Sequence, residues 1–167
     1  MKTLVFIILF ASAIFSSFGQ KKASVALPEM DSRILDMANL LTPSQEKDIF
    51  DLMMDLETQV GSKIGIATIE ALNGLPIEEY TRSLANQMAL GGKKRDGILI
   101  VFSLSDRQFR TEVSVGLEKT ITNDITDRIN RTVISPQFAA GNYALGFYNG
   151  IKAFAERIEA NKEQIGK

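Results

Sequence analysis

The chain has 167 residues, with 19 basic against 20 acidic side chains, and it contains neither cysteine nor histidine. The absence of these two residue types excludes disulfides, thiolate nucleophiles, serine–histidine triads and zinc sites built on sulfur or imidazole. The near-neutral charge, with no long basic block, argues against nucleic acid as a partner. Site chemistry must therefore use carboxylates, hydroxyls, amides, lysine and arginine, and a bound metal would be a hard cation such as calcium or magnesium.

The amino end has the three regions of a secretory signal peptide in order. A lysine at position 2 precedes the apolar run 4–15, and the small residues Ser17 and Gly19 suit a signal peptidase. The run is shorter than the ~20 residues that span a bilayer, which favours cleavage over an uncleaved anchor. We predict that residues 1–19 are removed before Gln20 and that the mature protein is periplasmic or secreted.

After the signal peptide, residues 20–29 are small and polar, are interrupted by Pro28, and are predicted to form an extended leader. The remainder, 30–167, has no internal repeat and no low-complexity segment, so it is predicted to be a single domain. Its first apolar stretch, 34–41, contains one acid, Asp36, and is either a short strand or a packed turn.

The first helix has clear boundary signals. Thr42 can cap it, Pro43 suits its first position, and Gln45 completes a capping box. An apolar face then recurs at helical spacing and ends at Gly61; its members are Ile49, Leu52, Met53, Leu56 and Val60. Acids occupy the other face and are interpreted as solvated surface; they are Asp48, Asp51 and Asp55.

A strand, a helix and two further strands follow. Residues 63–69 and 97–103 are short apolar runs rich in β-branched side chains, as is typical of strands covered on both faces. Between them, an apolar stripe that starts at Ile77 predicts a helix ending at a glycine pair. Residues 109–115 alternate apolar and polar, and a short polar turn makes them an antiparallel hairpin with 97–103.

Two helices close the chain. Thr122 caps the first, which is expected to end before Pro136. Gly146 and Gly150 are expected to let the second pack closely against a neighbour, with Phe147 on its inner side. The predicted fold class is α/β: a three-layer α/β/α sandwich in which a small mixed sheet of about four strands is flanked by about four helices.

The connection through a helix makes 63–69 and 97–103 parallel neighbours. If Ser103 pairs near Phe109, Asp96 lies opposite Gly116 at the end of the sheet that receives the helix after Thr122. A carboxylate cluster is predicted there, and its candidate members are Asp96, Glu118 and Asp124, joined by Asp36 and Asp127. Clustered acids repel one another unless a cation is shared, so the set is a candidate calcium or magnesium site.

Each of these acids also has a structural interpretation, since Asp124 can complement its helix and Asp96 can end a strand. The rival location is the opposite end of the sheet, beyond the carboxyl ends of the parallel strands, where open α/β sheets usually bind ligands. No glycine-rich phosphate loop occurs there, and Asn73 and Asp106 are interpreted as turn residues.

Four short motifs occur in order: ILDMANLL at 34–41, RDGILI at 95–100, VGLE at 115–118, and PQF at 136–138 followed by GNY. Together they resemble the TPM domain over about residues 30–158. That family takes in plant thylakoid-lumen proteins, a photosystem-repair protein of cyanobacteria, bacterial envelope proteins and a nematode receptor modulator. The resemblance implies a sandwich of helices around a small mixed sheet.

The resemblance also implies motif acids that bind a divalent cation in some members, and acid phosphatase activity claimed for some. Asp36, Asp96 and Glu118 match the motif acids. The family's usual Gly-Tyr before Gly-Leu-Glu is replaced here by Ser114-Val115, so no role of that tyrosine is carried over. Many bacterial members continue into a transmembrane helix and a glycine-rich tail; this sequence has neither after the signal peptide, which favours a stand-alone domain.

Two functions remain open. The favoured one is a non-enzymatic, monomeric binding or accessory module of the cell envelope, which binds calcium through clustered carboxylates and supports envelope or membrane protein complexes. The alternative is a metal-assisted acid phosphatase that hydrolyses phosphate monoesters, with a cation polarising a phosphoryl oxygen and a carboxylate activating water. The lack of histidine, and of any phosphoserine or phosphoaspartate motif, favours the binding module.

Overall fold

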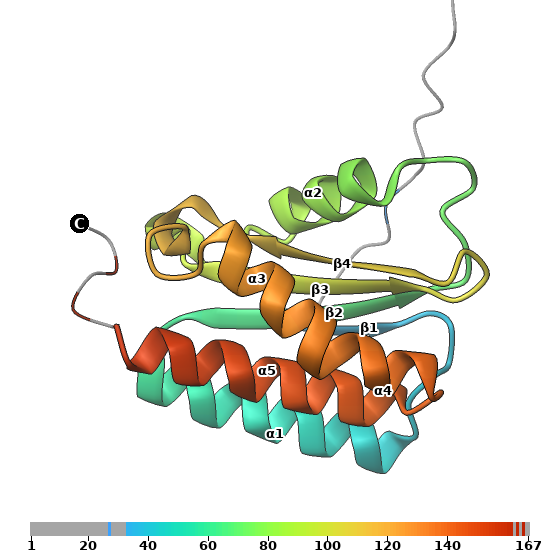
Figure 1. Cartoon of the computed structure of the whole chain (residues 1–167), viewed down its shortest axis with the longest axis horizontal. Coiled ribbons are helices and arrows are strands. Elements are labelled where there is room, and N and C mark those ends of the chain that lie inside the picture. Colours follow the sequence, from blue (N-terminus) through green and yellow to red (C-terminus); the bar gives the residue numbers. More distant parts are fainter. Residues whose placement is uncertain (1–26, 28–32, 162, 164, 166–167) are drawn as a thin grey trace, which may run out of the picture.

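The computed structural model describes residues 27, 33–161, 163 and 165 (Figure 1). The predicted signal peptide 1–19 and all of the leader except Leu27 lie outside the described residues. In the part of the chain that is described, none of the helices has the length and apolarity needed to cross a membrane.

The sheet has four strands in the order β1-β2-β3-β4, which are Ile34–Asp36, Lys63–Ile69, Gly97–Ser103 and Gln108–Val113. The first three are parallel and β4 is antiparallel to β3. The stretch 34–41 therefore starts as a short strand and continues as a turn. The two edge strands of the sheet are β1 and β4.

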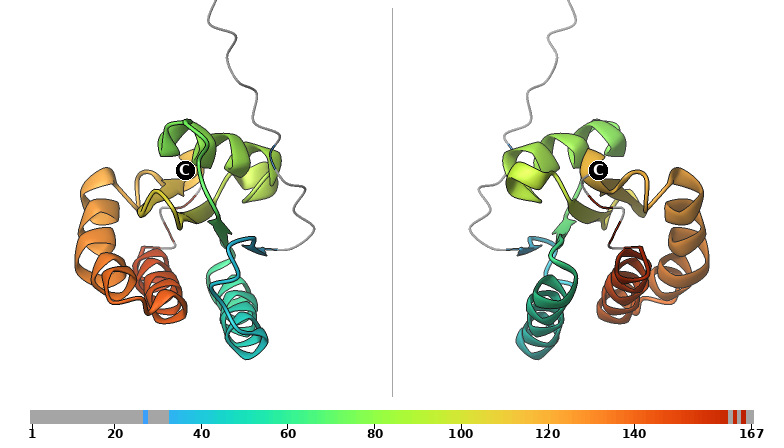
Figure 2. Two further views of the ribbon diagram at one scale, coloured as in Figure 1. Left: turned by 90° about the vertical axis from the view of Figure 1, so that its right-hand side faces the viewer. Right: turned by 90° about the vertical axis from the view of Figure 1, so that its left-hand side faces the viewer.

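Helices cover both faces of this sheet (Figures 1 and 2). One face carries α1 (Pro43–Val60), α5 (Tyr143–Glu159) and the consecutive segments α3 (Asn123–Ile129), η3 (Asn130–Ile134) and α4 (Ser135–Ala139). The other face carries α2 (Ile77–Gln87). The predicted three-layer sandwich with a small mixed sheet is confirmed.

Helix α1 forms where its boundary signals predict it. The Thr42 side chain accepts from the Gln45 backbone, the Gln45 side chain accepts from the Thr42 backbone, and Gly61 ends the helix in a left-handed conformation. Ile49 and Met53 are buried on its inner face. The three acids of the opposite face are exposed, as predicted.

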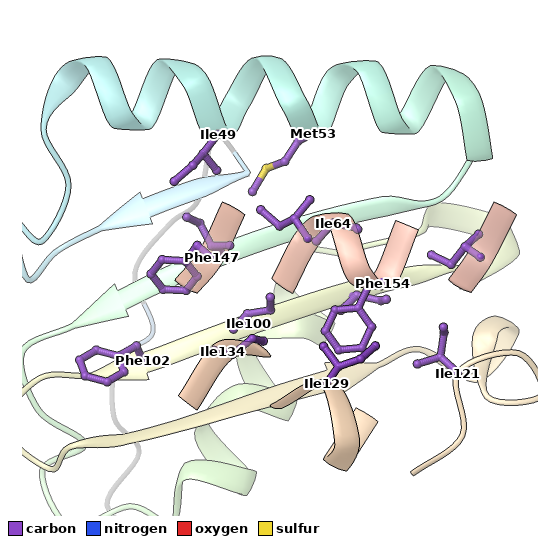
Figure 3. Packing of buried hydrophobic residues seen from close by; sticks show 14 of the residues in the cluster. Ile49, Met53, Ile64, Ile100, Phe102, Ile121, Ile129, Ile134, Phe147 and Phe154 are labelled. Atoms are coloured by element: carbon purple, nitrogen blue, oxygen red, sulfur yellow. The ribbon is translucent and has the colours of Figure 1, made fainter. Parts of the chain in front are cut away.

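The core lies on both sides of β2 and β3, since successive side chains of a strand point to opposite faces. Figure 3 shows the larger cluster, in which Ile64 and Ile100 of the sheet meet Phe147 and Phe154 of α5. On the other side, Leu99 packs with the apolar face of α2. Every residue of β3 is buried, which explains its continuous apolar sequence.

The two glycines of α5 lie at close contacts, as predicted. A Cβ at Gly146 would lie 2.5 Å from the Phe138 ring, and a Cβ at Gly150 would lie 2.7 Å from Ile134. The missing side chains let α5 pack against η3 and α4.

The prediction that the helix after Thr122 ends before Pro136 is wrong. The helical path continues from α3 through the π-helical turn η3 into α4, which contains Pro136. Within η3, the Ser135 amide donates to the carbonyl of Asn130, five residues back. This wider turn relieves the clash that a proline ring makes with the carbonyl four residues earlier, so the chain stays helical across the proline.

The predicted register of the hairpin is wrong by one residue. Ser103 pairs with Gln108, not Phe109, so it is Arg95 and not Asp96 whose carbonyl accepts from the Gly116 amide. The reason is the turn: Arg107 adopts a left-handed conformation, with φ of 51°, which closes the loop one residue earlier than predicted.

Phe147→Ala is expected to destabilise the domain by about 3–5 kcal/mol, because it removes a fully buried ring from the larger core cluster. Leu145→Ala on the same helix is the matched control, since Leu145 is 47% exposed and should change stability by about 0.5 kcal/mol or less. Urea unfolding measures both. Equal midpoint shifts for the two variants would contradict this account of the core.

Candidate functional site

The sheet separates the predicted site residues into two groups. Asp36 ends β1, and its partner Thr68 pairs in turn with Phe102 near the end of β3. Asp96 precedes β3, six residues before Phe102. At about 3.3 Å per residue, Asp36 and Asp96 lie about 20 Å apart, at opposite ends of the sheet.

Asp36 organises the turn that leads from β1 to α1. Its Oδ1 accepts from the Leu40 amide at 3.0 Å and from the Thr68 hydroxyl, and its Oδ2 accepts from the Leu41 amide at 2.9 Å. The left-handed Asn39, with φ of 51°, completes this turn. The carboxylate of this motif acid is therefore engaged by protein donors on both oxygens, which is a structural role.

Asp96 is buried at the other end of the sheet, with 4% of its surface exposed. Burial raises the pKa of its carboxyl above the ordinary value of 3.8, against the opposing effect of nearby Lys94 and Lys63. Its backbone carbonyl accepts from the Lys63 amide at 3.3 Å and so joins the start of β3 to β2.

The motif that contains Asp96 packs directly against the motif that contains Glu118. A Cβ at Gly116 would lie 2.4 Å from the carbonyl oxygen of Lys94 and 2.7 Å from that of Arg95. These neighbours are backbone atoms and cannot move away as a flexible side chain could. Gly116 is therefore required for the two motifs to meet, which brings Glu118 to the Asp96 end of the sheet.

The remaining predicted acids are exposed side chains, and Asp127 lies beside Phe109, toward the other end of β4. Glu118 follows the short 3₁₀ turn Val115–Leu117, while Asp124 and Asp127 lie on α3. The residues that the structure describes contain no group of three or more acidic side chains placed to hold a metal ion. The structure therefore does not bring the five predicted acids together at one ion.

A polar groove runs along β4 between α2 and α3, and we call it the β4 groove. It consists of three adjoining depressions with volumes of about 430, 500 and 620 Å³. The middle one shares lining residues with the depression near Asp127, namely Arg110, Thr111, Asn123 and Thr126. It shares others with the depression near Arg95, namely Arg82, Glu112, Val113 and Glu118.

Charges in the β4 groove are partly neutralised. Glu112 of β4 accepts from Arg110 at 3.2 Å and pairs with Arg82 of α2 at 3.7 Å. Glu118, which lines the middle depression and the one near Arg95, and Asp127, which lines the third, form no salt bridge with any of the described residues. The groove can thus present carboxylates, hydroxyls and amides to a partner.

Three groove residues were not predicted as site residues: Arg82, Arg110 and Glu112. The alternation of β4 already indicated that Arg110 and Glu112 leave the core. Their meeting with Arg82 depends on how α2 lies over β4, which spacing along the chain does not encode.

The carboxyl ends of the parallel strands hold a closed turn. Asp106 accepts from the Ser103 hydroxyl at 2.5 Å and from the Leu72 amide at 2.7 Å, and these two hydrogen bonds lower the pKa of its carboxyl. Asn73 adopts a left-handed conformation with φ of 51°. The interpretation of both as turn residues is confirmed.

Comparison with known proteins matches the chain to one family of domains and to solved structures of the same fold. The family model described as the TPM domain matches residues 34–157. The N-terminal domain of a protein from P. gingivalis has a TM-score of 0.71 and 28% identity, covering 78% of this chain and 84% of its own. The BA42 protein of the psychrophilic bacterium Bizionia argentinensis has a TM-score of 0.65 and 22% identity over 72% and 82% of the two chains.

A third similar structure is the N-terminal domain of the cg2496 protein from Corynebacterium glutamicum. Its TM-score is 0.61 with 13% identity, and the match covers 84% of this chain and 86% of that one. At this identity the likeness concerns the fold. No curated protein matches the sequence significantly.

Asp36→Ala is expected to destabilise the domain by about 2–3 kcal/mol, because the Leu40 and Leu41 amides and the Thr68 hydroxyl lose their acceptor. Asp124→Ala is the control: this exposed acid should cost less than about 1 kcal/mol through the helix dipole. Chemical denaturation checks both. An unchanged midpoint for Asp36→Ala would show that the turn does not depend on this carboxylate.

Two acids are expected to change stability in opposite directions with pH. At Asp96 the folded-state pKa is raised, so the stability it contributes is present below the ordinary value of 3.8 and is lost as pH rises through the raised pKa. At Asp106 the folded-state pKa is lowered. The stability that Asp106 contributes is therefore present above the ordinary pKa of 3.8 and is lost as pH falls through the lowered pKa.

Urea unfolding between pH 2 and pH 8 tests this pair. Relative to wild type, Asp96→Asn should gain stability as pH rises, and Asp106→Asn should lose it. Parallel pH profiles for the two variants would contradict the opposite environments of the two carboxyls.

Proposed function

The chain belongs to the TPM domain family, and from this premise we propose that it acts as an exported binding module of the cell envelope, with the β4 groove as its binding surface. Its partners would be envelope or membrane protein complexes. The observation that carries the proposal is the groove itself, which joins three polar depressions along one strand.

Groove chemistry supports binding. Its lining alternates guanidinium, carboxylate, hydroxyl and amide groups, which suit hydrogen bonding to a polar partner. Glu112 pairs with Arg110 at 3.2 Å and with the largely exposed Arg82 at 3.7 Å, so both guanidinium groups lie at the groove beside a carboxylate.

Calcium binding is proposed at fewer residues than the sequence predicts. The five predicted acids do not fit one ion, because Asp36 is far from the rest and engaged by protein donors, and Asp96 is buried. We propose that cations bind weakly and separately at two exposed carboxylates of the groove, Glu118 and Asp127, with water completing the coordination.

The acid phosphatase stays an alternative that rests on the family resemblance. A phosphate monoester must reach the carboxylate that acts on it, and Asp96, the acid on which the sequence argument centred, is 4% exposed. No feature of the described residues adds support to phosphoryl transfer over binding.

Titration of ¹⁵N-labelled protein, residues 20–167, with calcium chloride is expected to shift amides near Glu118 and Asp127 at millimolar concentration. Amides near Asp36 and Asp96 should not move. The control is the double variant Glu118→Gln/Asp127→Asn, which should lose the shifts. Shifts centred on Asp96, or persisting in the double variant, would place the cation elsewhere and contradict this part of the proposal.

A further inference from the structure

No strand in the described part of the chain pairs with the outer side of β4. The Ser114 amide donates to the Gly97 carbonyl, and this bond fixes the alternation of hydrogen bonding along the hairpin. Arg110 and Glu112 therefore direct their backbone groups toward β3. Phe109, Thr111 and Val113 direct theirs away from the sheet, toward the β4 groove.

The β4 groove runs along this outer side. Thr111 and Val113 line it on the strand, Arg82 lines it from α2, and Asn123 and Thr126 line it from α3. Thr111 is tied to the α3 side by a hydrogen bond between its hydroxyl and the Asn130 side chain, at 2.8 Å. The outward backbone groups thus lie along a channel with a helix on each side, and Thr111 in its middle is 5% exposed.

This geometry decides between two occupants. A second copy would have to bring its own α2 and α3, which border its own β4, up to the two helices that already border the channel. A single extended segment needs only the spacing of one more strand, about 4.8 Å. The channel therefore favours a peptide segment over a second domain.

The charged side chains that line the channel indicate the charge of the segment that it would bind. Arg82 and Arg110 share Glu112, and Arg95 also lines the groove, whereas the acids Glu118 and Asp127 lie in separate depressions and form no salt bridge with the described residues. Positively charged side chains on an incoming strand would complement these two carboxylates.

We propose that the β4 groove binds an extended, lysine- or arginine-containing segment of a partner protein, which adds to the sheet as a fifth strand beside β4. The main-chain hydrogen bonds come from Phe109, Thr111 and Val113, and Glu118 and Asp127 select for basic side chains. This inference rests on the proposed function, since it names the class of partner that the binding module takes.

The test uses the protein 20–167 and an acetylated heptapeptide of alternating lysine and valine as the probe. Amide hydrogen exchange followed by NMR should slow at least fivefold at Phe109, Thr111 and Val113. Exchange at Arg110 and Glu112 should not change, because these amides already donate to β3. An otherwise identical peptide with glutamate in place of lysine should bind at least fivefold more weakly at low salt.

The chain offers a matched pair of variants at one position. Val113→Pro removes an outward amide, which an edge strand tolerates, and should weaken peptide binding at least tenfold. Val113→Ala keeps the amide and should bind the peptide at least fivefold more tightly than Val113→Pro does. Exchange protection in the wild-type protein needs no variant, so the test stands even if Val113→Pro unfolds.

Three results would overturn the inference. These are no protection of the three outward amides at millimolar peptide, equal binding of the acidic peptide, and protection that depends on protein concentration without peptide, which would assign the edge to a second copy. Calcium shifts at Glu118 without peptide protection would reject this inference and leave the binding module in place. Peptide protection without calcium shifts would reject the cation instead.

Discussion

The parallel pairing of β2 and β3 is the constraint on which the rest of the structure depends. Both strands are covered by helices on two faces, so each side chain of β3 must be apolar or find a partner inside the fold. Polar chemistry is thereby displaced to the strand ends and to the edge strand β4. The turn acids Asp36 and Asp106 serve one end of the sheet, and the β4 groove forms along its edge.

Much of the fold could be predicted because its signals are local. The capping box at Thr42, the apolar run of β3 and the alternation of β4 each depend on a few neighbouring residues, and each led to the correct element. The helix across Pro136 was missed because a π turn absorbs the proline, and that turn depends on the packing of η3 against α5. The prediction that a helix ends before a proline assumes ordinary α-helical hydrogen bonding, which the π turn replaces here.

The candidate site was harder to predict for a geometric reason. Acids can be assigned to strand ends from sequence, but whether two ends coincide depends on strand direction and register. Asp36 lies at the end of β1, and Asp96 before the start of β3, so parallel strands place them on opposite sides of the molecule. Asp36 and Asp96 both belong to motifs of the family, but the sheet places them far apart in space. For Asp36 the motif position reflects a turn that must form before α1 can begin.

The contact of Gly116 with the backbone at Lys94 and Arg95 has a consequence for how this domain can vary in length. It fixes one end of the hairpin, and the left-handed turn at Arg107 closes the other. Side chains of a strand alternate with period two, so one residue inserted within β4 between these two points would move the strand residues on one side of the insertion to the opposite face. Insertions should therefore be accommodated in the turn 104–107 or in the surface loops outside residues 94–116, and not within the two paired strands.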